Sequence, residues 1–115
     1  MKTVLIVDAD LGFAFWLGHA LDQAGYYALS AACVESAARL LTELGMRADL
    51  VIIGVDQPGA AAFLADLRRT QNRLMVIALL DEPEPPTATA LPADLAEYKS
   101  LSNDEEARQD WVCTV

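Results

Sequence analysis

Short runs of consecutive apolar residues recur along the chain, separated by segments in which apolar residues are three or four positions apart. The strongest runs cover 4–7, 50–53 and 74–80, and a weaker one covers 26–31. A run that is apolar at every position is typical of a strand buried on both faces of a parallel sheet. We therefore predict strands in these four ranges, and a short fifth strand within 95–101.

Helical spacing of the apolar residues between these runs predicts three helices, at 11–24, 34–44 and 60–71. Asp10 stands at a helix N-cap position, and Gly25 and Gly45 stand where left-handed C-caps are expected. The residues predicted to face the core are Phe13, Trp16, Leu17, Ala20, Leu21 and Ala24, then Ala37, Leu40, Leu41 and Leu44, then Phe63, Leu64 and Leu67.

The pattern changes after residue 80, because residues 81–92 hold four of the chain's five prolines. Proline at this density excludes a long regular helix. A fourth helix is therefore expected to be shortened or irregular. Asn103 is placed to cap a last short helix over 104–111, which has acidic residues in its first turn.

Alternating strands and helices predict a doubly wound α/β sandwich, a (βα)5 unit with a central five-stranded parallel sheet, as one domain over 1–115. In such folds ligands bind at the carboxyl ends of the strands. The loops to inspect there contain Asp8 and Asp10, Gly54 and Asp56, Asp81 and Glu82, and Lys99 and Ser100.

The charge of the chain limits the classes of partner that it is expected to bind. The 115 residues carry 8 Lys and Arg against 17 Asp and Glu, a net charge of −9, which disfavours nucleic acid and anionic membrane surfaces. The apolar run at 4–7 is too short for a signal peptide or a membrane span. Cys33 and Cys113 have no metal-site spacing, so we expect reduced thiols and a cytoplasmic protein.

Two stretches carry a resemblance to a known family. VLIVDADLGFAFWLGHALDQAGY at 4–26 and ADLVIIGVDQPG at 48–59 resemble the response-regulator receiver (CheY-like) domain of two-component signalling. The similarity runs from residue 2 to about 105 and is weak after residue 80. It implies the flavodoxin-like fold of that family, and a phosphoryl group that passes from a histidine kinase to an aspartate.

Position by position, the resemblance implies a degenerate receiver. The acceptor aspartate falls on Gly54, which has no side chain, and of the pair of metal-binding acids Asp8 is kept while the second falls on Ala9. The readout hydroxyl falls on Leu80, or less well on Ala78. The family's lysine falls on Lys99. We therefore expect no catalytic residue, no cofactor, and Mg²⁺ binding that is weak or absent.

Several alternatives stay open. Phosphorylation at a non-standard acid would use Asp56 or Asp8. Against Asp56, two extended residues advance a side chain by about 6–7 Å, so we favour a solvated loop acid there and a helix cap at Asp10. Lys99 either pairs with Asp8 or is exposed. A nucleotide- or flavin-binding domain is disfavoured, because acids rather than a glycine-rich loop follow the first strand.

The resulting functional hypothesis is a phosphorylation-independent signalling module that binds a protein partner, with a homodimer left open. An independent enzyme is not expected, since the sequence has no Ser/His/Asp set and no Cys/His pair. Phe15 falls off the apolar stripe of its helix, near His19, and is expected to be exposed, either singly or as part of a partner surface. Trp111 and Val112 are further candidates for contact.

Overall fold

Strands and helices alternate along the part of the chain that the computed structural model describes, which comprises residues 2–54, 56–71, 74–80 and 95–98. The elements are β1 (Thr3–Val7), α1 (Leu11–Gln23), β2 (Tyr27–Ala31), α2 (Val34–Leu44), β3 (Leu50–Gly54), α3 (Ala60–Thr70), β4 (Met75–Leu80) and β5 (Leu95–Tyr98). Every strand and helix predicted within these residues is confirmed, and most bounds differ by one residue or none.

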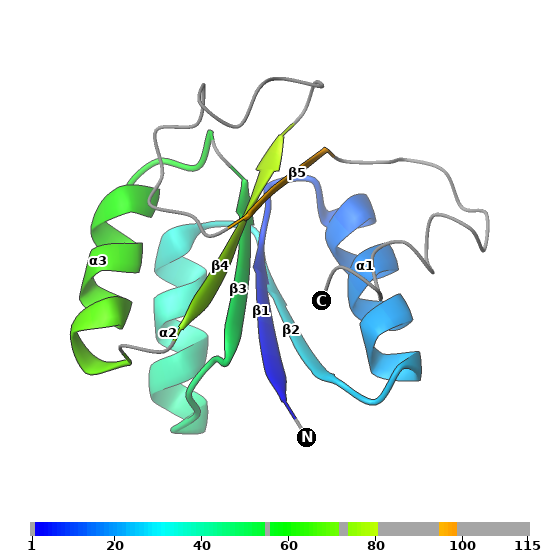
Figure 1. Ribbon diagram of the computed structural model, residues 1–115, viewed down its shortest axis with the longest axis horizontal. Helices are drawn as coiled ribbons and strands as arrows, with labels where there is room; N and C mark the ends of the chain where they lie inside the picture. Colours follow the sequence, from blue (N-terminus) through cyan, green and yellow to red (C-terminus); the bar gives the residue numbers. More distant parts are fainter. Residues whose placement is uncertain (1, 55, 72–73, 81–94, 99–115) are drawn as a thin grey trace.

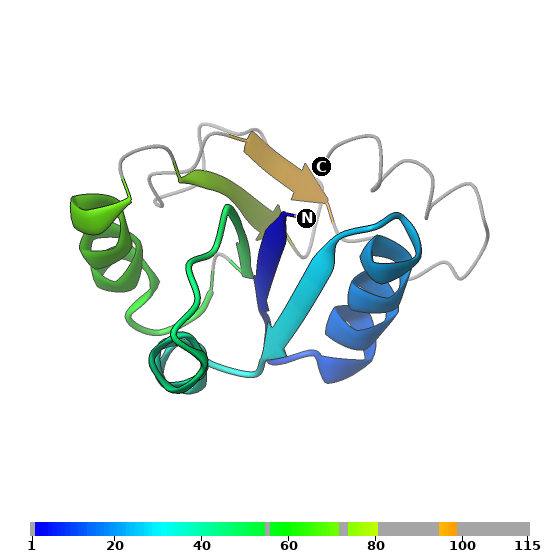
Figure 2. The ribbon, with the colours of Figure 1, turned by 90° about the horizontal axis from the view of Figure 1, so that it is seen from below.

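All five strands are parallel and lie in the order β2-β1-β3-β4-β5 (Figures 1 and 2). Val7 at the end of β1 pairs with Ala31 of β2 on one side and with Ile53 of β3 on the other. After β1 the chain thus adds β2 on one side of β1, and it then crosses over to add β3 on the other side of β1. The carboxyl ends of β1 and β3 meet at this reversal, where doubly wound folds bind their ligands.

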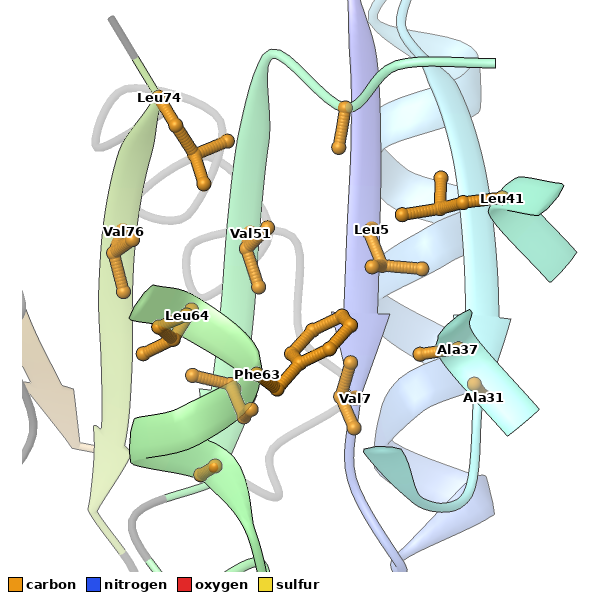
Figure 3. Packing of buried hydrophobic residues seen from close by; sticks show 13 residues of the cluster. Leu5, Val7, Ala31, Ala37, Leu41, Val51, Phe63, Leu64, Leu74 and Val76 are labelled. Carbon is orange, nitrogen blue, oxygen red and sulfur yellow. The ribbon is translucent and has the colours of Figure 1, made fainter. Parts of the chain in front are cut away.

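Two separate cores cover the two faces of the sheet. Alternate residues of β1 belong to the two cores. Val4 and Ile6 face α1, whereas Leu5 and Val7 face α2 and α3. Figure 1 shows α1 on one side of the sheet and α2 and α3 on the other. In Figure 3, residues of α2 and α3 pack over the side chains of β1, β3 and β4. Burial on both faces explains the continuous apolar runs.

The ends of α1 and α2 have the glycine caps that the sequence predicts. Gly25 and Gly45 come just after α1 and α2 with φ angles of 96° and 61°, in the left-handed region that a side chain would strain. After α2, the N–H of Met46 donates to the carbonyl of Leu41 at 3.2 Å. These contacts satisfy carbonyl groups that the helix itself leaves open.

Five predicted core positions are only partly buried or are exposed. Trp16, Leu40 and Leu67 are half-buried, and Ala24 is exposed. On α1, Ala14 is buried in place of Trp16, because its methyl group lets the helix approach the sheet closely. The Trp16 ring lies beside the stripe, 5.8 Å from the ring of Phe13.

At the end of α2, Leu44 is 48% exposed and is likewise not a core residue. It lies in the last turn of the helix, where the chain leaves the sheet. Phe15 on α1 is 61% exposed, as predicted from its position off the stripe. His19, one turn further along, is exposed too.

No described helix combines the length and apolar character needed to cross a membrane. Several predictions lie outside the described residues: those on the proline-rich stretch 81–92 and the fourth helix, on Asp81 and Glu82, on residues 99–101, on the last helix, and on Trp111, Val112 and Cys113.

The core facing α1 gives a test of the packing. Ile52 of β3 is fully buried there, so Ile52→Ala is expected to lower the free energy of unfolding by about 2–5 kcal/mol through lost transfer energy and a cavity. Phe15→Ala, on the exposed side of α1, should change it by no more than about 0.5 kcal/mol. Urea unfolding followed by circular dichroism measures both, and a large loss at Phe15 would contradict its exposure.

Candidate functional site

A buried carboxylate lies where β1 ends. Asp8 is 3% exposed, and its N–H donates to the carbonyl of Ala31 at 3.0 Å, which extends the β1–β2 ladder by one step. Its Oδ1 accepts from the N–H of Asp10 at 2.9 Å. Asp8 is therefore held rigidly at the carboxyl edge of the sheet, at the position predicted for the retained acid.

Asp10 has a local structural role. Its Oδ1 accepts from the N–H of Phe13 at 3.1 Å, so it caps α1 as predicted, and its side chain is otherwise exposed. Asp8 fixes the backbone of Asp10 and Asp10 fixes the first turn of α1. The two acids thus form one chain of hydrogen bonds between strand and helix.

Gly54 ends β3 beside this carboxylate, and it is buried. A Cβ atom at Gly54 would lie 3.1 Å from Oδ1 of Asp56, 3.7 Å from Cγ of Gln57 and 3.9 Å from the carbonyl oxygen of Val7. The first of these distances is shorter than an ordinary van der Waals contact. A side chain at residue 54 would therefore require the exposed Asp56 carboxylate to move by a few tenths of an ångström.

Asp56 lies close to the end of β3. The N–H of Gln57 donates to the carbonyl of Gly54 at 3.2 Å. The argument that the Asp56 side chain is carried about 6–7 Å away is wrong, because it assumed an extended chain, whereas β3 ends at Gly54 and Oδ1 of Asp56 lies near the place of a Gly54 Cβ. Asp56 is nevertheless exposed, as expected of a loop acid.

Gln57 is a site residue that the sequence analysis missed. It is only 8% exposed, and its Nε2 donates to the carbonyl of Ala32 at 3.1 Å, which joins the loop after β3 to the loop after β2. The sequence showed only a Gln-Pro-Gly chain break here. A polar residue in a loop gives no sign of burial when its partner is 25 residues away.

Cys33 is the next side chain along this edge and forms the N-cap of α2 as a free thiol. The hydroxyl of Ser36, 3.3 Å from Sγ, and the N–H of Ser36 favour the thiolate and lower the pKa of Cys33. Partial burial and the charge of Glu35 oppose this shift more weakly.

The remaining predicted site residues are not assembled within the described part of the chain. Lys99 and the side chain of Leu80 lie outside it, and Ala78 is a buried methyl group in β4. Among the described side chains no three of the types His, Cys, Asp and Glu are grouped so as to hold a metal ion. The described edge therefore offers a buried carboxylate at Asp8 and exposed ones at Asp10 and Asp56.

Comparison with known proteins identifies the fold. No protein-family model matches the chain, and no curated protein matches it in sequence. Among solved structures it is similar to the chemotaxis response regulator CheY4 of Vibrio cholerae, with 23% identity over 99% of this chain and 98% of that one and a TM-score of 0.76. A putative response regulator from Chloroflexus aurantiacus gives 24% identity, coverage of 98% and 93%, and a TM-score of 0.76.

A third similar structure is the response regulator TrrA of Thermotoga maritima, which was solved in complex with Mg²⁺ and BeF. It is 24% identical, with coverage of 96% of each chain and a TM-score of 0.71. The predicted fold class is confirmed by these likenesses: the chain has the flavodoxin-like α/β fold of CheY-like receiver domains.

The contact between Cys33 and Ser36 predicts a pH dependence of alkylation. In a Cys113→Ala background, the rate of reaction of Cys33 with iodoacetamide should reach half its maximum at a pH below that of an unstructured cysteine peptide. Ser36→Ala should move this midpoint upward, because the thiolate loses its hydroxyl donor. Thr42→Ala is the control, since the Thr42 hydroxyl bonds the carbonyl of Ala38. An unchanged midpoint in Ser36→Ala would contradict the assignment.

Proposed function

We propose that the chain is a receiver-like module of a two-component or phosphorelay system that works without phosphorylation and acts by binding another protein. The likeness of its fold to response regulators supports the signalling role. The observation that carries the rest is Gly54: the position that the resemblance assigns to the acceptor has no side chain, so no phospho-aspartate can form there.

Aspartyl phosphorylation requires a carboxylate that attacks phosphorus, and a cation that neutralises the oxygens of the transferred group. Mg²⁺ needs several oxygen ligands in a near-octahedral arrangement. At the carboxyl edge Asp8 supplies one buried carboxylate, while the neighbouring Ala9 supplies only an exposed methyl group. Asp8 already accepts a hydrogen bond from the backbone of Asp10. These residues therefore favour neither the binding of Mg²⁺ nor the transfer of a phosphoryl group.

A module of this kind presents a fixed surface to its partner. A ligand or modification shifts a protein between two states only if it interacts differently with each of them. Without an acceptor, the phosphoryl group provides no such difference. The net charge of −9 disfavours nucleic acid and anionic lipid, which leaves a cytoplasmic protein as the partner. In this proposal the chain has no enzymatic activity of its own.

One observation favours a second candidate function. The Asp56 carboxylate lies over Gly54 and not further along the loop, so it occupies the region where an acceptor would react. A phosphorylatable Asp56 would have to recruit a cation with the help of Asp8.

Treatment with a small phosphodonor separates the two candidates. The protein is incubated with acetyl phosphate and Mg²⁺, and its intact mass is measured beside that of a receiver that keeps its acceptor aspartate. We expect the mass of the control to rise by one phosphoryl group and that of this chain to stay unchanged. Amide NMR spectra with Mg²⁺ and beryllofluoride should likewise show no saturable shifts at Asp8, Gly54 or Asp56.

Variants make the contrary outcome interpretable. If the chain does gain a phosphoryl group, Asp56→Ala and Asp8→Ala show which acid carries it. A gain that disappears only in Asp56→Ala would establish the displaced acceptor and overturn the proposed function.

A further inference from the structure

We propose that two copies of this chain associate through the open edge of β2, so that their two β2 strands pair antiparallel and join the two sheets into one. The inference goes beyond the proposed function, because it rests on β2 and not on the acceptor position. It identifies a second copy of the chain as a partner and one strand as the surface that binds it.

The first support is the direction of the backbone groups in β2. The N–H of Tyr27 donates to the carbonyl of Lys2 at 2.9 Å, so Tyr27 and every second residue after it bond to β1. The N–H and carbonyl groups of Ala28 and Ser30 therefore point away from β1. No described residue supplies a partner for these groups, because β2 pairs with β1 alone among the described strands.

The second support is that β2 lacks the features by which edge strands avoid pairing with another chain. Such strands usually carry a charged residue, a proline or a bulge. The segment Tyr27–Ala31 has no charged residue and no proline, and its register with β1 runs without interruption. Its first four residues are exposed or half-buried, whereas β1 and β3 are buried throughout. The opposite edge strand, β5, contains Glu97, so the edge of β2 is the one suited to the addition of a strand.

The third support is the distribution of charge. Each copy has a net charge of −9, so two copies repel each other over most of their surfaces. Between Asp10 and Glu35, however, the sequence has a single charged residue, Asp22, although 22% of the whole chain is charged. This stretch forms α1 and β2, and it exposes Phe15 and Tyr27. Two copies that meet on this side bring few carboxylates together.

The outward groups also select a register for the two strands. With the two-fold axis at Leu29, Ala28 lies opposite Ser30 of the second copy, and each donates its N–H to the carbonyl of the other. Two such pairs, related by symmetry, use all the outward N–H and carbonyl groups of both strands. With the axis at Ser30, Ala28 would instead lie opposite Ala32, whose carbonyl already accepts from Gln57.

Sedimentation equilibrium of the full chain, with a thiol reductant present, measures the association. We expect a monomer–dimer equilibrium, and a chain that stays monomeric at about 1 mM would overturn the proposal. Ser30→Pro removes an outward N–H but no bond to β1, and an edge strand accepts proline at such a position. It should weaken dimerisation by about tenfold or more, whereas Ser30→Ala keeps the N–H and should dimerise like the native chain. Equal weakening in both variants would contradict a role of the backbone.

Amide hydrogen exchange of the native chain, followed by NMR at high and at low protein concentration, locates the contact without a substitution. The N–H groups of Ala28 and Ser30 should exchange more slowly at the high concentration, while that of Leu29, which bonds to β1 within each copy, should be protected at both. Unchanged exchange at Ala28 and Ser30 in a chain that dimerises would overturn the proposal. A dimer that is lost in Phe15→Ala and kept in Ser30→Pro would overturn it too, because the copies would then meet on α1.

Discussion

Side-by-side pairing of β1 with β3 is the constraint on which the rest of this structure depends. Val4 to Val7 pair with Leu50 to Ile53, and both strands are buried on both faces. Because the strands are parallel, their carboxyl ends must come together. Asp8 and Gly54 are therefore neighbours whether or not they share any chemistry. The scaffold draws its stability from the two cores on either side of these strands.

At that edge, Gly54 is followed by an exposed acid, Asp56, and by Gln57, whose Nε2 donates to the carbonyl of Ala32 in the loop after β2. Asp8 and Asp10 accept hydrogen bonds from backbone N–H groups. These two acids thus serve local structure between β1 and the first turn of α1.

The fold could be predicted because each strand and helix carries its own signal. Apolar runs marked β1, β3 and β4, and a glycine marked the ends of α1 and α2. Burial on α1 was harder to predict: Ala14 is buried and Trp16 only partly, because close packing on a sheet selects small residues that hydrophobicity alone undervalues. At the site, Asp8 and Asp10 were placed correctly because strand and cap chemistry are local. The burial of Gln57 depends on its bond to Ala32, and no local pattern encodes that contact.

A switch requires a ligand that binds one of two states better than the other, and the strength of the response cannot exceed that difference. At the carboxyl edge of this sheet residue 54 has no side chain, and Asp8 and Asp10 already accept hydrogen bonds from backbone N–H groups. In the function that we propose, a phosphoryl group therefore has no attachment at residue 54 through which it could favour one state. Signalling would then depend on how much of the domain is present and on what binds it.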